Sequence, residues 1–380
     1  MNLIKNQVEH IKTELAKYID SDIRRINVLA ELMIAIPLSR STQGNDLAEN
    51  IIRDVQDQSI QQMLSRFYKN DAITWECFYA PLVKLLLKSL SLPTYYLVID
   101  TTDVGSNHRV LVLSLSYQNR SLPLIWKVEK GTKGHTKEDV QVDLLKKLAP
   151  YFQPANSDSP VIFLGDSEFD GVALQTQLRE NGWHYILRTS PHLHICHDKK
   201  SKGISLGSLV SRPLSEQDAI SEQTVTNVLF TKKHLYGPIS CYACWEYGHD
   251  IPLILIYHLP DGWPPSPRHT YKIRFSTEPL FADCKEDGFR LHKSRLKHPE
   301  RLSRLFLAIS ASYLWMTVLG AWAFVSQQTN QVDRSNRRTL SIFKTGWRWF
   351  KRQLKLGRFV SFSLLLPPLF DFPNLKYTKP

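Results

Sequence analysis

One stretch of the chain limits its possible folds more than any other. From Leu305 to Val325, 21 consecutive residues carry no charge, and this length is sufficient to cross a lipid bilayer. Ser310, Thr317 and Gly320 interrupt the stretch, which continues from an amphipathic segment that starts at Pro299. We therefore expect a helix that is buried on all sides in a large protein core, and no membrane partner.

The composition is that of a globular protein with two or three domains. The chain has 380 residues, of which 43% are hydrophobic and 22% are charged. Lys and Arg number 48 against 36 Asp and Glu, so the net charge is +12, which favours a polyanionic partner such as nucleic acid. The five cysteines are widely scattered, and the chain opens on a polar segment of mixed charge. Both features predict a cytoplasmic protein.

The first ninety residues have the periodicity of helices. Apolar residues recur three and four positions apart, and polar breaks at 39–45 and around Asn70 divide the segment into three or four short helices. The piece 42–67, with Arg53 and Arg66, resembles a small helical DNA-binding unit. A solvated helical bundle explains the same pattern equally well.

From Thr94 the period changes to that of strands. Three β-rich runs separated by polar turns predict an antiparallel meander, and a helix that Thr136 can cap follows them. A buried strand at 161–164, a helix and a further strand around 183–189 complete a mixed α/β sheet. Residues 192–264 contain short strands between Gly, Pro and Ser turns, which predicts a β-rich insertion.

Two acidic residues stand where buried strands are expected to end. Asp100 follows the apolar run 95–99, and Asp166 lies just past the run 161–164. Carboxylates beyond the last buried residues of neighbouring strands can share a divalent metal ion. A lone Asp more commonly caps a turn or a helix, and this interpretation stays open.

A third acid belongs to a helical segment. At roughly 100° per residue from Tyr271, Arg274, Glu278 and Lys285 fall on one arc, where a carboxylate could hold a cation and its neighbours could hold a phosphodiester. Pro279 predicts that the helix starts or kinks near Thr277, so only the second half of the arc is firm. Without other context, the pattern is more typical of a solvated amphipathic face.

These motifs together resemble the DDE-type insertion-sequence transposases of the branch named for a Tyr-Arg-Glu-Lys signature. Tyr271, Arg274, Glu278 and Lys285 match the signature spacing without a gap. The runs IDTTD at 99–103 and LGDSEFDG at 164–171 resemble the two Asp motifs of the family. Ser167 and Glu168 replace the usual Arg-Gly, and Phe275 stands where many relatives have Trp.

The resemblance implies a fold, a reaction and a set of site residues. The fold is an RNase H-like mixed-sheet α/β catalytic core, divided into 93–191 and 265–328 by the β-rich insertion 192–264 and preceded by a helical DNA-binding domain over 1–92. Asp100, Asp166 and Glu278 would hold two Mg²⁺ ions, with Mn²⁺ as a substitute, for cut-and-paste transposition. Tyr271, Arg274 and Lys285 would position the phosphates of the transposon ends and the target DNA. The enzyme would act as a homodimer on DNA in the bacterial nucleoid.

The composition of the C-terminal region 329–380 predicts a basic tail. Residues 334–358 contain nine Arg or Lys and no acid. Trp347, Trp349 and Phe350 alternate with cationic residues, a composition suited to phosphate contact and base stacking. We predict DNA contact through Arg348, Lys351 and Arg352. The alternative is a helix that docks through its aromatic residues on the catalytic domain.

Three other interpretations fit parts of the sequence less well than a transposase does. A catalytically inactive DNA-binding derivative, acting as a repressor or architectural protein, would have no need of the three acids. A stand-alone nuclease would not need the insertion. A zinc site built from the histidines at 192–197 and from Cys241 and Cys244 is disfavoured, because residues three apart on a strand face opposite sides.

Overall fold

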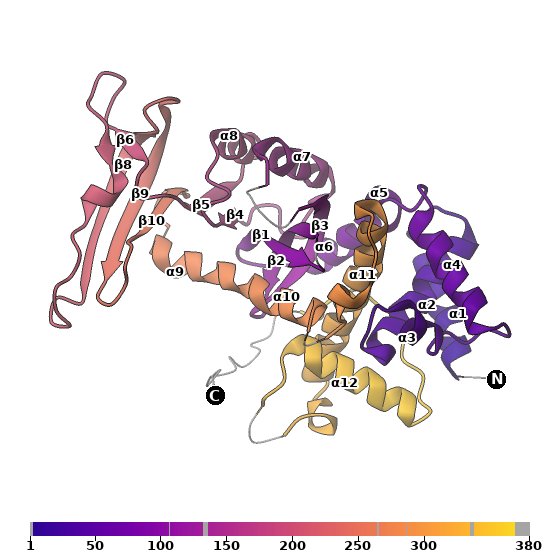
Figure 1. The fold of residues 1–380 in the computed structure, drawn as a ribbon. Helices are drawn as coiled ribbons and strands as arrows, with labels where there is room; N and C mark the ends of the chain where they lie inside the picture. Colours follow the sequence, from indigo (N-terminus) through magenta and orange to yellow (C-terminus); the bar gives the residue numbers. More distant parts are fainter. Residues whose placement is uncertain are drawn as a thin grey trace.

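The computed structural model describes residues 3–105, 107–131, 136–263, 266–286, 288–334 and 338–368. A ten-stranded mixed sheet runs through the molecule, with the N-terminal helices at one end and a group of long strands at the other (Figure 1). The long helix α11 (Pro299–Val325) contacts both the N-terminal helices and the sheet. The chain is therefore a mixed α/β protein with N-terminal helices, as predicted.

Six helices precede the first strand, where three or four were expected. Their bounds are α1 (Leu3–Leu15), α2 (Ile23–Ser39), α3 (Gly44–Ala48), α4 (Asp57–Lys69), α5 (Trp75–Phe78) and α6 (Ala80–Ser89). The difference arises because α3 and α5 are single turns of five and four residues, too short to show a period. The breaks at 39–45 and at Asn70 are confirmed. Arg40 closes α2 in the left-handed region, with φ 55°.

The first half of the sheet follows the predicted order of elements. It contains β1 (Tyr95–Val104), β2 (His108–Tyr117), β3 (Arg120–Lys130), α7 (Glu138–Leu148), β4 (Val161–Gly165), α8 (Val172–Glu180) and β5 (His184–Arg188). The antiparallel meander of β1, β2 and β3 is confirmed, and β4 pairs in parallel with both β1 and β5. The strand order in this half is β3-β2-β1-β4-β5.

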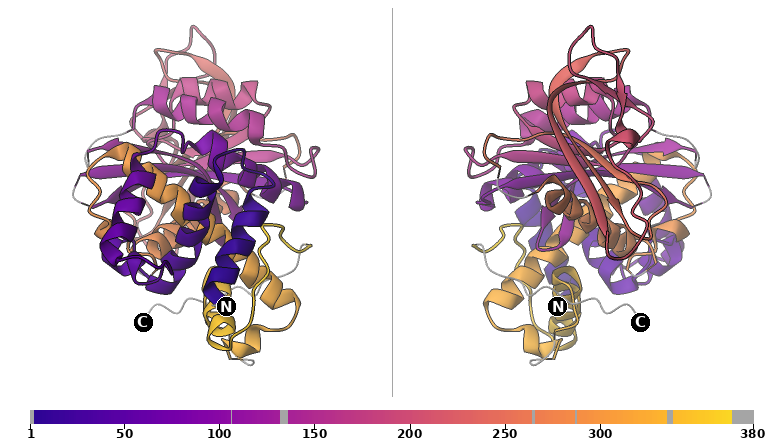
Figure 2. Two further views of the ribbon diagram at one scale, coloured as in Figure 1. Left: turned by 90° about the vertical axis from the view of Figure 1, so that its right-hand side faces the viewer. Right: turned by 90° about the vertical axis from the view of Figure 1, so that its left-hand side faces the viewer.

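Residues 192–264 fold into strands that continue the same sheet. These are β6 (His194–Cys196), β7 (Ile204–Ser205), β8 (Ile220–Phe230), β9 (Tyr236–Glu246) and β10 (Leu253–His258). Because β10 pairs antiparallel with β5, the sheet extends without a break in the order β5-β10-β9-β8-β6-β7. Figure 2, right, shows the long strands β8 and β9 crossing the end of the molecule. Most of β8 is exposed.

The two closest cysteines of this segment lie on opposite faces of β9. Cys241 belongs to the main hydrophobic core, whereas Cys244 packs with Leu255 and Tyr271 in a second, smaller cluster. The geometric argument against a shared ligand role for this pair is thereby confirmed.

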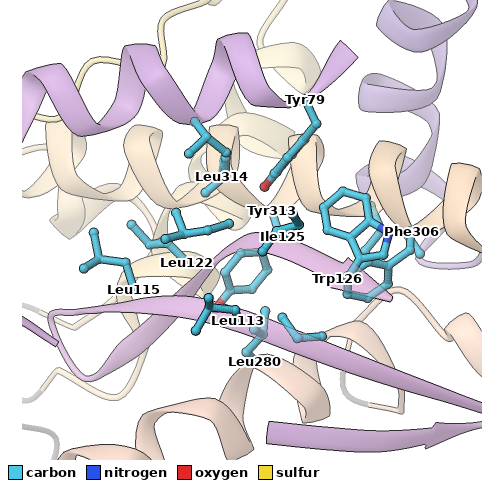
Figure 3. Close-up of a cluster of buried hydrophobic side chains, with 14 of the residues drawn as sticks. Tyr79, Leu113, Leu115, Leu122, Ile125, Trp126, Leu280, Phe306, Tyr313 and Leu314 are labelled. Carbon is cyan, nitrogen blue, oxygen red and sulfur yellow. The ribbon is translucent and has the colours of Figure 1, made fainter. Parts of the chain in front are cut away.

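The uncharged stretch forms the core helix that was predicted. Pro299 is the first residue of α11, and the most apolar part of the helix is 94% buried. The Trp126 ring of β3 packs between Phe306 of α11, at 5.0 Å, and Tyr79, at 4.8 Å. Figure 3 shows these rings with the leucines of β2 and β3 between the sheet and the helices. This helix is part of the protein core and not a membrane span.

The basic C-terminal region contains a helix, α12 (Ile342–Lys355), that packs along α11. The two backbones approach closely at Gly320 and Gly346. A Cβ atom at Gly320 would lie 1.9 Å from the Ile342 carbonyl oxygen, and one at Gly346 would lie 1.9 Å from that of Met316. Only glycine permits this approach. Residues 369–380 of the predicted tail, and Arg337 among its cations, lie outside the described residues.

The remaining short helices connect these elements. Four of them are the 3₁₀ helices η1 (Ala149–Tyr151), η2 (Leu206–Leu209), η4 (Leu291–Lys293) and η5 (Thr329–Gln331), and the others lie between residues 267 and 284, near the candidate site.

Candidate active site and nucleic-acid interface

Asp100 and Asp166 occupy matching positions on adjacent parallel strands. The parallel register pairs Val98 of β1 with Leu164 of β4, and each aspartate stands two residues further along. The apolar run before Asp100 ends at Ile99, but the strand itself continues beyond Asp100. Its antiparallel pairing with β2 continues to Val104, whereas its pairing with β4 stops at Val98. Asp100 therefore lies inside β1 but at the carboxyl edge of the β1–β4 pair, where ligands bind in parallel sheets.

The Asp100 carboxylate is held by three donors. Its Oδ2 accepts a hydrogen bond of 2.8 Å from the Thr277 hydroxyl and pairs with Arg274 Nη1 at 3.1 Å. The Thr101 N–H donates to Oδ1 at 2.9 Å. Burial raises the pKa of Asp100 above its ordinary value, Arg274 opposes the rise, and the charge of Asp166 adds to it.

A further carboxylate borders this pair. Glu168 donates its backbone N–H to Asp166 Oδ1 at 2.9 Å, and its side chain accepts from the Thr101 hydroxyl at 3.3 Å. It also accepts the backbone N–H of Thr136. The prediction that Thr136 caps the following helix is wrong: α7 begins at Glu138 with Lys137 as its N-cap, because the Thr136 backbone turns towards Glu168.

The signature residues follow a helical path that changes pitch. Helix α9 (Pro267–Tyr271) leads into the 3₁₀ helix η3 (Lys272–Ser276) and then into α10 (Thr277–Cys284). The predicted helix start near Thr277 is confirmed. A constant 100° per residue does not hold across η3, which has about three residues per turn, so the single arc is wrong in its first half.

Tyr271, the first residue of the signature, is buried. Its side chain packs in the second cluster with Val98 and Leu164, and its hydroxyl has no hydrogen-bond partner among the described residues. The Arg274 guanidinium carbon lies 5.7 Å from the Tyr271 ring and 4.8 Å from the Phe275 ring. The rings therefore hold the guanidinium beside Asp100.

Glu278 and Lys285 lie at the two ends of α10. Glu278 is exposed and directly follows Thr277, whose hydroxyl contacts Asp100. Lys285 is half-buried at the end of the helix, and burial lowers its pKa, with Asp103 opposing the shift. Among the described residues, no three His, Cys, Asp or Glu side chains gather closely enough to hold a metal ion. The structure thus brings Asp100 and Asp166 together and places Glu278 on the adjoining helix.

Sequence reasoning missed the contributions of Thr277 and Glu168. Thr277 directly precedes the signature glutamate, and it was used only to mark the start of a helix. Glu168 was noted only as a departure from the family string. Neither contact follows from helical or strand period, because each joins elements that are distant in the chain.

Helix α12 is docked through its aromatic side chains. Phe343 and Phe350 are fully buried, and the Trp347 indole N–H donates to the Pro37 carbonyl at 2.8 Å. Base stacking by Trp347 and Phe350 is therefore a wrong expectation, and the docked-helix alternative describes α12. Arg348 and Arg352 are exposed and Lys351 is half-buried, so the cationic side chains remain on the outer face.

One arginine of the suggested N-terminal DNA-binding unit is neutralised within the protein. Arg53 Nε and Nη2 donate to the two carboxylate oxygens of Glu31 at 2.9 and 3.0 Å. Glu31 is 7% exposed, so this pair joins the segment 42–67 to α2. Arg53 is committed to a structural contact.

Comparison with known proteins identifies the chain. The family model of the transposase DDE domain matches residues 101–315, more than half of the sequence. The chain therefore belongs to this family, and it is a transposase that cleaves DNA and transfers strands. The matched range includes Asp166 and Glu278 and begins one residue after Asp100. Members of the family typically use divalent metal ions, and their substrate is DNA. No curated protein matches the chain.

Proposed function

We propose that the protein is a cut-and-paste transposase of the Tyr-Arg-Glu-Lys branch, which binds the terminal inverted repeats of an insertion sequence. The signature spacing supports the branch. The strand order β3-β2-β1-β4-β5, with β1 to β3 as a meander, supports an RNase H-like core. Residues 192–264 would be its β-rich insertion, 1–92 a helical DNA-binding domain, and 329–380 a basic C-terminal region.

Asp100, Asp166 and Glu278 are the proposed metal ligands. The observation that carries this assignment is the position of Asp100 and Asp166, which stand in register at the carboxyl edge of two adjacent parallel strands. Two carboxylates in register are a donor set that suits Mg²⁺, and a bound ion would compete with the Arg274 guanidinium for Asp100 Oδ2. Glu278 would complete the set from α10, which Thr277 ties to Asp100.

Bound Mg²⁺ would activate a water molecule or a 3′-hydroxyl and stabilise the leaving oxygen in an in-line displacement at phosphorus. The chain's own residues orient the reaction. Thr277 and the Thr101 N–H fix the Asp100 carboxylate, and Arg274 supplies a positive charge beside it. We assign Arg274 and Lys285 to phosphate positioning. Tyr271 would position phosphates indirectly, by holding Arg274 in place.

The remaining proposals concern the DNA complex. Arg348, Lys351 and Arg352 on the outer face of α12 would contact DNA phosphates. The transposon ends would be held by a homodimer, as the resemblance implies, on nucleoid DNA in the cytoplasm.

The experiment uses a supercoiled plasmid that carries the DNA flanking the gene. Asp100→Asn, Asp166→Asn and Glu278→Gln each remove a ligand charge and preserve shape. We expect each variant to bind this DNA as the wild type does and to lose strand cleavage in Mg²⁺ by at least about 10³-fold.

Asp143→Asn is the matched control, because Asp143 is an exposed carboxylate on α7. It should cleave at the wild-type rate. Cleavage at the wild-type rate by Asp100→Asn or Glu278→Gln would refute the metal role of that residue. DNA binding without cleavage by the wild type itself would instead favour an inactive derivative.

A further inference from the structure

A positively charged cavity lies between the C-terminal end of α2 and helix α12. It has a volume of about 430 Å³, and six of its nine lining residues are cationic: Arg40, Lys344, Arg348, Lys351, Arg352 and Lys355. Arg40 comes from the end of α2 and the other five come from α12, while Gln331 and Val332 form the remaining wall with Trp347. Among the residues that the structure describes, no acidic side chain lines this cavity.

The cationic side chains of α12 form a stripe along one side of the cavity. Lys344, Arg348, Lys351 and Lys355 follow one another three or four residues apart, so they share one face of the helix. At 1.5 Å per residue this face is about 16 Å long, and the same length of duplex DNA carries about five phosphates per strand. The stripe is therefore too long for a single phosphate group.

Arg40 is held in place by the opposite wall. Its guanidinium carbon lies 5.2 Å from the centre of the Trp347 ring, and Trp347 is itself fixed by its hydrogen bond to Pro37. The cap position in the left-handed region turns the Arg40 backbone out of α2. An arginine positioned in this way loses little freedom when it binds an anion.

The cations of the cavity lie close enough to repel one another, and one of the six has a counter-charge within the protein. Among the described residues, Lys344 pairs with Asp283 at 3.7 Å, and no carboxylate forms an ion pair with the other five. The pKa of Lys351 is lowered by burial and then by the charges of Arg40 and Lys355. A polyanion in the cavity would relieve this repulsion.

A second cavity of about 570 Å³ continues the first. It shares Gln331, Val332 and Arg348 with it and adds Arg334. Its acidic lining residue, Asp333, accepts the backbone N–H groups of Thr339 and Leu340 and is thereby committed to the fold. The positive surface therefore extends beyond α12 itself.

We propose that Arg40 and the outer face of α12 form one composite subsite for the sugar-phosphate backbone of duplex DNA, separate from the acidic site on β1 and β4. The inference rests on the proposed DNA contact of α12 and adds the N-terminal helices to it. Because its donors are cationic side chains that would contact phosphates, the subsite should increase the affinity for any duplex. It should not distinguish one DNA sequence from another.

The test measures binding of the full-length protein to a labelled duplex of arbitrary sequence as KCl is varied. The logarithm of the binding constant falls linearly with the logarithm of the KCl concentration. The size of this slope should decrease by about 0.9 for Arg40→Gln and by about twice that for the double variant Arg348→Gln, Arg352→Gln. Arg40→Lys keeps the charge and should keep the slope. Lys88→Gln, which removes an exposed cation at the end of α6, is the matched control and should match the wild type.

Thermal unfolding of each variant shows whether the fold is intact. A wild-type slope for Arg40→Gln would overturn the composite subsite, even if cleavage fails as expected in Asp100→Asn. A second outcome would also overturn it: inorganic phosphate raises the melting temperature of the wild type but not that of Arg40→Gln, while the two proteins show the same salt dependence of DNA binding. The occupant of the cavity would then be a free phosphate. If the wild type binds no duplex at all, the proposed function itself is contradicted.

Discussion

Helices α10 and α12 are both short and both pack on the core through one face, yet they present opposite kinds of chemistry. Helix α10 places Thr277 beside one partly buried carboxylate, Asp100, to which its hydroxyl donates a hydrogen bond. Helix α12 turns its aromatic residues inward and leaves a row of cations outside. The first arrangement depends on exact geometry, and the second depends on the amount of charge.

This contrast predicts different responses to mutation. Contacts around Asp100 form one network, so their effects should not be additive. Phosphate contacts along α12 should each change the salt dependence by a similar step. The two helices are nevertheless joined, because the buried Asp283 of α10 pairs with Lys344 of α12 and with Arg120 of β3.

The largest effect is expected where the two helices are joined. Asp283 is 2% exposed at its side chain, and it lies 3.5 Å from Arg120 Nη1 and 3.7 Å from Lys344 Nζ. Asp283→Ala leaves a buried arginine without its counter-charge and should cost about 3–5 kcal/mol of unfolding free energy. Urea denaturation measures it.

An exposed ion pair provides the control for this measurement. Asp250 pairs with Arg212, and its side chain is 94% exposed. Asp250→Ala should change the unfolding free energy by less than about 0.5 kcal/mol. Equal effects of the two variants would show that Asp283 does not join α10 to α12.

The next effect concerns the docking of α12 alone. A Cβ at Gly346 would meet the Met316 carbonyl oxygen at 1.9 Å and the Gly320 nitrogen at 2.4 Å. Gly346→Ala should therefore separate α12 from α11 and cost about 2–3 kcal/mol. Gly44→Ala, where the nearest atom lies 3.9 Å away, is the control and should leave the melting temperature nearly unchanged. A wild-type melting temperature for Gly346→Ala would mean that the two helices can separate freely.

A smaller effect should appear in catalysis on the α10 side. Thr277→Val removes the hydroxyl that donates to Asp100 at 2.8 Å and keeps the shape of the side chain. The loss of about 1.4 kcal/mol should slow strand cleavage about tenfold. Thr277→Ser restores the hydroxyl and should restore most of the rate in the same assay. A slow serine variant would point to packing of the Thr277 methyl group instead.

The smallest effect depends on pH and concerns the loop before α12. Partial burial alone would raise the pKa of Asp333, but N–H groups of Leu340, Thr339 and Arg334 lower it overall. Since the folded pKa lies below the unfolded one, the ionised carboxylate stabilises the fold at neutral pH, and this contribution disappears as the pH falls below about 4. Asp333→Asn should lose about 1 kcal/mol at neutral pH. The difference from wild type should shrink in urea titrations at acidic pH, and a difference independent of pH would exclude the charge as its cause.

Most of the fold could be predicted from the sequence because its signals are local. The strands of the meander, the buried strand β4 and the helix at 299–325 all follow from period, length and flanking residues. The continuation of the sheet from β5 into β10 could not be predicted, because the partner of a strand is not encoded in its own period. Residues 192–264 were expected to form a β-rich insertion, and their strands belong to the same sheet as the strands of the core.

The candidate site divides in the same way. The positions of Asp100 and Asp166 after apolar runs were visible in the sequence. The extension of β1 to Val104 depends on β2, and the burial of Tyr271 depends on β1 and β4. For α12, the alternation of aromatic and basic residues could not reveal which group faces inward. That depends on the close approach of α12 to α11 at Gly320 and Gly346, which joins distant parts of the chain.

The central position of α11 has a consequence for the order in which the protein can be made. The N-terminal helices and all ten strands precede Pro299 in the chain, yet α2, α4 and β3 pack on this one helix. During synthesis, the apolar surfaces of these elements therefore stay uncovered until α11 leaves the ribosome, which happens only after all the strands have been made. The nascent chain holds an open core for most of its translation, so this enzyme should depend on chaperones more than a protein whose core closes early.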